Sequence, residues 1–139
     1  MSDSQRLPVA CHALAYLAHK GAYGPKAALS SAELAASVPT NPVVIRRVTA
    51  MLARAGLIAT RPGANGGAWL LAPAENIDLG RVLEAVNGCA HLGIPPAGSK
   101  DCPIGQKIPV EVGKAIDAAN DAATRQLAKV SVADLLKGC

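Results

Sequence analysis

The sequence predicts a mainly α-helical fold with one small β-hairpin and a long C-terminal helix. Apolar residues recur at spacings of three and four in several segments, which is the pattern of amphipathic helices. A stretch rich in Gly, Pro and Asn, PGANGG, separates two short apolar runs, as in a hairpin. Half of the residues are hydrophobic but only 2% are aromatic. We therefore expect a core of Ala, Val, Leu and Ile side chains.

The size and composition of the chain limit what it can be. Its 139 residues suit one domain with at most a small appendage, and 17% charged residues are too few for a disordered chain. The first ten residues lack the layout of a signal peptide, and no apolar run approaches the roughly 20 residues of a membrane helix. We expect a cytoplasmic protein without a membrane partner. The net charge of +4 favours an anionic partner.

The N-terminal third contains two predicted helices. The first covers residues 7–20 and ends in GAYGPKA, whose Gly and Pro residues form turns. Ser30 and Glu33 have the spacing of a capping box, so a second helix starts there. It ends before Pro39 and holds only two turns.

The third predicted helix has the clearest signals. Asn41 suits the N-cap, Pro42 suits the first helical position, and Gly56 suits the left-handed residue after the end. Its apolar face is formed by Ile45, Val48, Leu52 and Ala55. The opposite face carries Val43, Arg46, Arg47, Ala50 and Arg54. One side of this helix is therefore expected to pack and the other to be basic.

The rest of the chain is predicted to form the hairpin, three further helices and a loop. The hairpin pairs residues 57–61 with 68–71, and Asp78 caps a helix that runs through Val86. A Gly- and Pro-rich loop follows, then an amphipathic helix from Pro109 to about residue 129 and a brief helix capped by Ser131. We divide the chain into a winged helix-turn-helix domain (1–87), a loop (88–108), and a dimerisation helix with the short C-terminal helix (109–139).

A helix, a tight turn, a capped helix with a basic outer face and a Gly-rich hairpin occur in the order of a winged helix-turn-helix. A recognition helix enters the DNA major groove by its N-terminal residues, where Arg can bond guanine and Val can meet a thymine methyl. We therefore expect double-stranded DNA as a partner. The residues predicted to contact it are Ser31, Thr40, Asn41, Pro42, Val43, Arg46, Arg47, Arg61, Asn65, Gly66 and Gly67.

A simpler interpretation of the hairpin and the basic face stays open. Gly66 and Gly67 can simply make the turn, and Arg61 can be a solvated surface charge. Three arginines on one helix face can also be no more than a solvated surface. The order of the elements favours the DNA-binding interpretation over this one.

The region from the first helix to about Val86 resembles the DNA-binding domain of the Rrf-two family of bacterial transcription regulators. The most specific part is LxxAGLIxTxxGxxGGxxLxxP from Leu52 to Pro73, followed by IDLGRVLEAV. Residues 102–136 are similar to family members that lack a metal cluster. The resemblance implies a sequence-specific transcription regulator, and we expect a repressor.

The resemblance also implies a homodimer whose long helices pack against each other. The apolar stripe agrees, because it is longer than one small domain buries alone. Its members are Val112, Ile116, Ala119, Ala123 and Leu127. The alternative is packing of this helix against the first helix of the same chain. A two-fold dimer predicts a palindromic operator with half-sites about one helical turn apart, or a multiple of it.

The cysteines depart from the pattern of the cluster-binding relatives, which resemble each other in three closely spaced cysteines before the long helix. Here that loop offers Cys89 and Cys102, with His91 nearby, whereas a [2Fe–2S] cluster takes four ligands. We expect no cofactor and no metal, although Cys11 of a partner chain or a nonstandard ligand would complete a set. The alternative sensor is thiol oxidation at Cys89, Cys102 or Cys11. A small-molecule sensor, or no sensor at all, also stays open. Cys139 is expected to be incidental.

Two other function classes compete with a regulator. A protein-interaction module on the same scaffold is one, since fold does not fix function, but the basic helix face and the Gly-rich wing disfavour it. An enzyme is the other. The sequence contains no GxSxG, HExxH, Walker A or GxGxxG motif, and no nucleophile and base can be assembled from it. We therefore expect no enzymatic activity.

Overall fold

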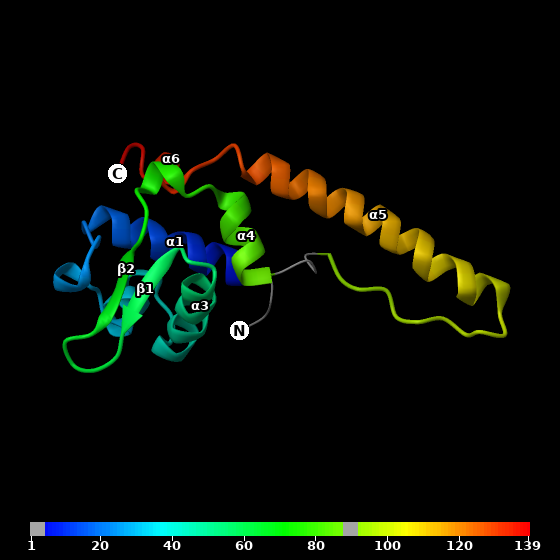
Figure 1. Ribbon diagram of the computed structural model, residues 1–139, viewed down its shortest axis with the longest axis horizontal. Coiled ribbons are helices and arrows are strands. Elements are labelled where there is room, and N and C mark those ends of the chain that lie inside the picture. The colour runs from blue at the N-terminus through cyan, green and yellow to red at the C-terminus, as the bar shows by residue number, and fades with distance from the viewer. Residues whose placement is uncertain (1–4, 88–91) are drawn as a thin grey trace.

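The molecule has two parts of different shape, a head and an arm (Figure 1). The computed structural model describes residues 5–87 and 92–139. The head comprises α1 to α4, the hairpin and α6, and the arm consists of α5 with the segment 92–102 that leads into it. The elements are α1 (Arg6–His19), η2 (Pro25–Ala27), α2 (Ser31–Ser37), α3 (Pro42–Arg54), β1 (Ile58–Arg61), β2 (Gly67–Leu70), η3 (Ala74–Asn76), α4 (Leu79–Asn87), α5 (Pro103–Leu127) and α6 (Val132–Leu135).

The predicted helix caps of the head are present. The Ser30 N–H donates to Glu33 Oε2 (2.7 Å) and the Glu33 N–H donates to Ser30 Oγ (3.1 Å), which closes the capping box of α2. The Asn41 side chain accepts from the Val43 N–H at 2.8 Å and starts α3. Gly56 follows α3 with φ +77°, a conformation that suits glycine. These local signals confirm the helix-turn-helix.

The hairpin is part of a wider backbone pairing. Strands β1 and β2 are antiparallel, with Ile58 opposite Leu70. On its other side β2 pairs with the segment before α2, because the Leu29 N–H donates to the Ala68 carbonyl (3.0 Å) and the Ala68 N–H donates to the Leu29 carbonyl (2.8 Å). The Leu70 N–H donates to the Ala22 carbonyl at 2.8 Å. The wing is therefore tied to the chain between α1 and α2.

The core of the head is aliphatic, as the composition predicted. It lies where α1 packs against α3, α4, β2 and α6. Its largest fully buried side chains are Leu14, Leu17, Leu34, Ile45, Leu52, Leu57, Ile58, Leu70, Ile77, Val48, Val82 and Val132. Burial of each such side chain stabilises the fold by roughly 1.5–3 kcal/mol, which holds α3 and the wing in fixed positions. None of the helices in residues 5–87 and 92–139 is both long and apolar enough to cross a membrane.

The expected start of the long helix at Pro109 is wrong, because α5 begins six residues earlier, at Pro103. Cys102 is its N-cap and Pro103 occupies the first helical position, where a missing N–H has no cost. Pro109 lies inside the helix and cannot donate to the carbonyl of Gly105. The expected loop over 88–108 is therefore shorter, and its last residues are helical.

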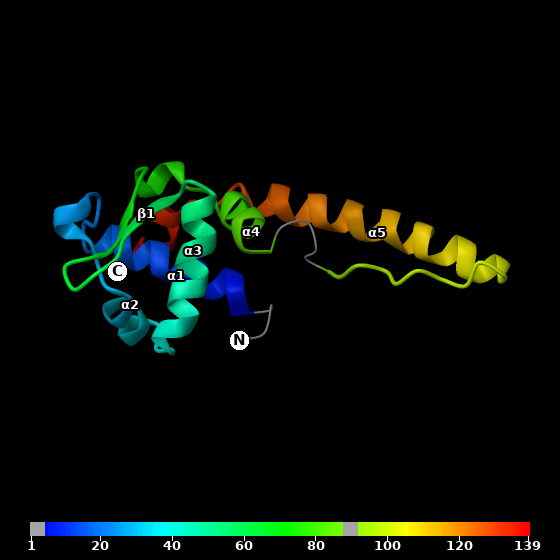
Figure 2. The ribbon, with the colours of Figure 1, turned by 60° about the horizontal axis from the view of Figure 1, so that its bottom comes forward.

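The segment 92–102 runs back along α5, as the two ribbon views agree (Figures 1 and 2). The segment crosses the helix at two glycines, Gly98 of the segment and Gly105 of α5. A Cβ at Gly98 would lie 1.9 Å from the Gly105 carbonyl oxygen, the one that Pro109 leaves without its helical donor. Two glycines thus permit the close crossing at the far end of the arm.

The near end of the arm is fixed to the head by backbone bonds. The Leu79 N–H donates to the Val130 carbonyl (2.9 Å) and the Val132 N–H donates to the Ile77 carbonyl (2.8 Å). A Cβ at Gly80 would lie 2.9 Å from the Thr124 carbonyl oxygen, so α4 and α5 approach closely here. Figure 2 shows α5 leaving the head beside α4. The base of α5 therefore cannot shift without disturbing α4.

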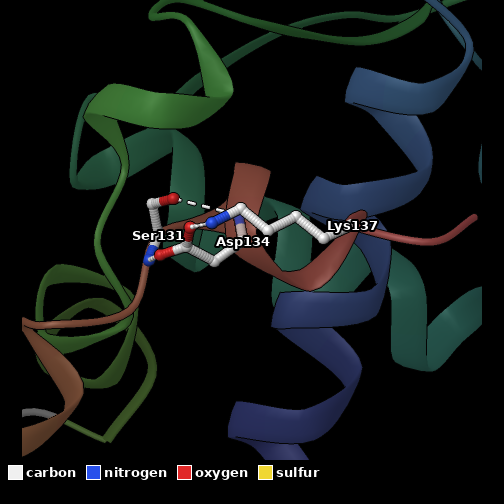
Figure 3. A network of polar contacts seen from close by, with 3 residues as sticks. All are labelled: Ser131, Asp134 and Lys137. Carbon is white, nitrogen blue, oxygen red and sulfur yellow. Dashed lines mark hydrogen bonds and ion pairs between the residues drawn. The ribbon is translucent and has the colours of Figure 1, made fainter.

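Helix α6 has the predicted capping box and an additional ion pair (Figure 3). The Ser131 N–H donates to Asp134 Oδ2 (2.9 Å), and the Asp134 N–H donates to Ser131 Oγ (3.0 Å). Lys137 Nζ lies 2.9 Å from Asp134 Oδ1. The Ser131 N–H, together with Lys137, lowers the pKa of Asp134 from 3.8 to about 2. The fold therefore favours the ionised carboxylate.

This network predicts a pH-dependent contribution to stability. Because the pKa of Asp134 is lower in the folded than in the unfolded chain, its contribution is complete above about pH 5 and is lost as the pH falls from about 4 to 2. Urea unfolding of the wild type and of Asp134→Asn, compared at pH 2 to 6, should show a stability difference that shrinks toward pH 2. A difference that does not vary with pH would contradict this role.

Candidate nucleic-acid interface

A groove of about 480 Å³ opens between α2, the outer face of α3 and the wing. Five residues of the predicted DNA-binding set line it, and they come from three separate elements. Ser31 lies in the first turn of α2, Arg46 on α3, and Arg61, Gly66 and Gly67 on the wing. We call it the α3–wing groove. Two guanidinium groups and the start of a helix thus share one hollow, an arrangement suited to a polyanion.

The other predicted contact residues lie outside the lining of this groove. Thr40, Asn41, Pro42 and Val43 form the turn before α3 and its first residues. Val43 is 45% exposed although it is apolar. Asn41 uses its side-chain oxygen to cap the helix, so its amide group is the part that can donate to an external acceptor. The start of α3 is therefore presented outward.

The two central arginines of α3 face solvent on the side opposite the core. Arg46 and Arg47 are both exposed, whereas Ile45 and Val48 are fully buried. Only Arg46 lines the α3–wing groove, because residues one apart on a helix point about 100° apart. The structure therefore separates the two arginines, with one turned toward the wing.

Thr49 is a groove residue that the sequence reasoning missed. It is only 8% exposed, and its hydroxyl donates to the Arg46 carbonyl at 3.1 Å. Its position lies between the apolar face and the basic face of α3, so it forms the floor of the groove under Arg46. A polar residue at such a boundary is the signal that could have identified it.

Arg61 has a structural partner in the wing. Its guanidinium donates from Nη2 to the Asn65 carbonyl at 3.0 Å, across the tip of the hairpin. The side chain remains exposed, so the bond orders the loop and leaves the positive charge accessible. The interpretation of Arg61 as a solvated charge is thus incomplete, since the residue also closes its own turn.

The two wing glycines are required by the packing of the wing itself. A Cβ at Gly66 would lie 2.0 Å from the Arg61 carbonyl oxygen. A Cβ at Gly67 would lie 2.3 Å from the Leu29 carbonyl oxygen, and Gly67 has φ +147°. The simpler interpretation, that these glycines make the turn, therefore has direct support. Contact of the two residues with DNA stays a prediction.

The predicted dimerisation stripe is divided between two environments. Val112 is 43% exposed, and Ala119 and Ala123 are also exposed, whereas Ile116 is half-buried. Leu127 instead packs against the core of its own head. The alternative, packing of the long helix against α1, is not the main contact of α5 within the chain, which is with α4.

Two further residues extend the stripe toward the start of α5. Ile104 is 65% exposed and Ile108 is 45% exposed, and they stand eight and four residues, respectively, before Val112. The sequence reasoning missed them because it took Pro109 as the start of the helix. The signal was present, since Cys102–Pro103 repeats the N-cap and proline arrangement of Asn41–Pro42.

The cysteines of the described residues carry free thiols and lie in different settings. Cys102 is exposed at the start of α5, where its sulfur accepts from the Gly105 N–H at 3.4 Å. Cys11 is half-buried on α1, and burial raises the pKa of its thiol to about 11. Cys139 is exposed. The predicted redox candidate Cys89 lies outside the described residues.

The described residues do not supply a ligand set for an iron–sulfur cluster. Nowhere in residues 5–87 and 92–139 are three His, Cys, Asp or Glu side chains grouped so that they could hold a metal ion. The start of α5 with Cys102 lies at the far end of the arm, away from the head that contains α1 and Cys11 (Figure 1). One protomer therefore does not bring these two thiols together.

Comparison with known proteins gives a consistent result. The chain matches the family model of Rrf2, described as an iron-dependent transcriptional regulator, over residues 3–138. It is 31% identical over 134 residues to "Putative HTH-type transcriptional regulator YwnA" of Bacillus subtilis (strain 168), with 96% of each chain covered. These matches are to transcriptional regulators, not to enzymes.

Solved structures agree. A crystal structure of a "putative DNA binding protein" superposes with a TM-score of 0.72 at 31% identity, covering 94% of this chain and 98% of the other. A "putative transcriptional regulator" from Lactobacillus plantarum gives 0.73 at 25% identity, with 94% and 87% covered. The winged helix fold with a long C-terminal helix is confirmed. The chain belongs to the Rrf2 (Rrf-two) family of DNA-binding transcriptional regulators.

Proposed function

We propose that the protein is a homodimeric repressor that binds a palindromic operator through the start of α3 and the α3–wing groove. The observation that carries the proposal is the convergence of Arg46 of α3 and Arg61 of the wing on one groove. These charges come from two different elements, α3 and the wing, and the core fixes both. A solvated surface has no need of such convergence, whereas a DNA backbone that passes between helix and wing does.

Each part of this surface has a distinct role in the proposal. Thr40, Asn41 and Val43 enter the major groove with the first turn of α3, where Val43 meets a thymine methyl. Arg47 contacts a base edge or a phosphate from the exposed face. Arg46, Ser31 and Thr49 line the proposed path of the DNA backbone, and the start of α2 adds N–H groups. Arg61 and Asn65 carry the wing into the minor groove.

The dimer of the proposal is formed by the exposed face of α5. Ile104, Ile108, Val112, Ile116, Ala119 and Ala123 form a continuous stripe along a helix that projects from the head. Water-exposed apolar area of this length favours a second copy, since the same stripe is self-complementary about a two-fold axis. Repression follows from occupancy, because a dimer over two half-sites blocks access to the promoter it covers.

The proposed sensor is a thiol and not a cluster. The described residues offer no ligand set, whereas Cys11 and Cys102 are free thiols and Cys89 is a further candidate. Oxidation of such a thiol would change the dimer geometry and thus the operator affinity. The protein acts where the chromosome is, in the cytoplasm.

The arginines provide the first test. An operator selected from random duplexes should bind Arg46→Ala and Arg47→Ala about 5- to 150-fold more weakly than the wild type. Where the lost contact is to a phosphate, the slope of log K against log salt should fall by about one unit per protomer. Fluorescence anisotropy at several salt concentrations measures both quantities.

Arg81→Ala is the matched control, because it removes the same charge from the exposed side of α4, outside the α3–wing groove. It should keep affinity and salt slope. If both α3 variants behave like Arg81→Ala, the groove is not the DNA-binding surface. Absence of any duplex binding by the folded wild type at low salt would instead support a protein-interaction module.

The stripe on α5 provides the second test. Ala119→Asp places a charge in the proposed interface, where an unpaired buried charge costs about 3–5 kcal/mol. Light scattering should show dimers of the wild type and monomers of Ala119→Asp, at least about 100-fold weaker in association. Ala118→Asp makes the same change on an exposed residue off the stripe and should stay dimeric. Equal masses for both variants would remove the stripe from the interface.

A further inference from the structure

A second groove, of about 370 Å³, lies between α1 and the C-terminal end of the chain. Two of the four cysteines of the chain line it, Cys11 from α1 and Cys139 from the residues after α6. The walls between them include Tyr16, Leu135 and Leu136. We call this the α1–α6 groove. The fold thus places at one groove two cysteines that are separated by nearly the whole sequence.

The position of Cys139 in this groove is set by α6. The buried Val132 holds α6 against the head, and the capping box fixes the start of the helix. Helix α6 packs against α1. The Cys139 N–H donates to the Leu136 carbonyl at 3.0 Å, so the chain turns back after the helix. Gly138 makes this turn with φ +87°, a conformation that glycine adopts readily. Cys139 therefore lines the groove beside α1.

The two thiols differ in exposure, and this difference gives them different roles. Cys139 is exposed, so a dissolved oxidant reaches it. Cys11 is half-buried, and burial raises its pKa to about 11, so it is protonated at neutral pH and is not the first thiol to react. Its hydrophobic setting instead favours a product without charge. His12 and His19 also line the groove, but no three metal-ligating side chains are grouped in the described part of the chain.

We propose that Cys11 and Cys139 are joined within one protomer by a disulfide when the protein meets a hydroperoxide. In the first step the Cys139 sulfur attacks the peroxide, the O–O bond breaks, and Cys139 becomes a sulfenic acid with release of water or an alcohol. In the second step the Cys11 sulfur, on loss of its proton, attacks the Cys139 sulfur and displaces hydroxide, which leaves as water. The two thiols lose two electrons and the peroxide gains them.

The cross-link would connect the first and the last helix of the head, α1 and α6. It ties α1, which packs against α3, to α6, which directly follows the base of α5. Through these contacts the oxidation state of the pair reaches both the recognition helix and the dimerisation helix. This consequence for DNA rests on the proposed function, whereas the cross-link itself does not.

Peptide mapping tests the cross-link directly. The full-length protein and Cys102→Ser are treated with hydrogen peroxide, blocked with iodoacetamide in denaturant, and digested with trypsin without reductant. Cleavage after Arg6, Lys20 and Lys137 leaves Cys11 in the peptide Leu7–Lys20 and Cys139 in the peptide that begins at Gly138. We expect the major oxidised species of both proteins to carry Leu7–Lys20 linked to the peptide that begins at Gly138, in monomeric chains on non-reducing gels.

Cys139→Ser is the matched variant, because it alters an exposed residue and should keep the fold. Its oxidised form should lack the linked peptide and the rise in Tm, of several degrees, that closing a loop of this length gives the wild type. The proposal is overturned if both cysteines of the oxidised wild type are recovered as alkylated thiols, or if Cys139 is linked only between chains. Operator affinity of the reduced protein, measured on the same samples, tests the proposed function separately.

Discussion

The arrangement of the head depends on one backbone pairing, between Leu29 and Ala68. Two hydrogen bonds of 3.0 and 2.8 Å join the segment before α2 to the second strand of the wing. The pairing requires a residue without a side chain next to it, because a Cβ at Gly67 would lie 2.3 Å from the Leu29 carbonyl oxygen. The two segments meet so closely that the pairing joins the wing to the start of the helix-turn-helix. The α3–wing groove exists because α2 begins directly after this point, at Ser31.

The head also fixes the base of the 25-residue helix α5. Backbone bonds between Leu79 and Val130 and between Ile77 and Val132 fix the base of α5, and Gly80 allows α4 to lie close against it. The outer part of α5 projects beyond the head, and most of its apolar stripe is exposed. In the proposed regulator two routes would connect the dimer to the DNA surface. Helix α4 packs against both α3 and α5, while α6, which follows α5 in the chain, packs against α1, and α1 contacts α3. The α1–α6 groove lies on the second route.

Much of this could be predicted from the sequence, because the strongest signals are local. Asn41 before Pro42 fixes the start of α3, and the spacing of Ile45, Val48 and Leu52 fixes which face is buried. The predicted start of the long helix at Pro109 is wrong. Cys102–Pro103 carries the same N-cap and proline pattern as Asn41–Pro42, and α5 begins there.

Features that depend on distant residues had no signal in the sequence. The glycine requirement at Gly67 comes from Leu29, and the shared groove of Cys11 and Cys139 comes from the packing of α6 on α1. We infer that the Leu29–Ala68 pairing shapes the proposed DNA-binding surface, and the operator affinity of folded Gly67→Ala tests this inference most directly. We expect at least a tenfold loss, with a much smaller effect of Gly63→Ala, which shares a positive φ but has open space around its Cβ position. Unchanged affinity of folded Gly67→Ala would contradict the account.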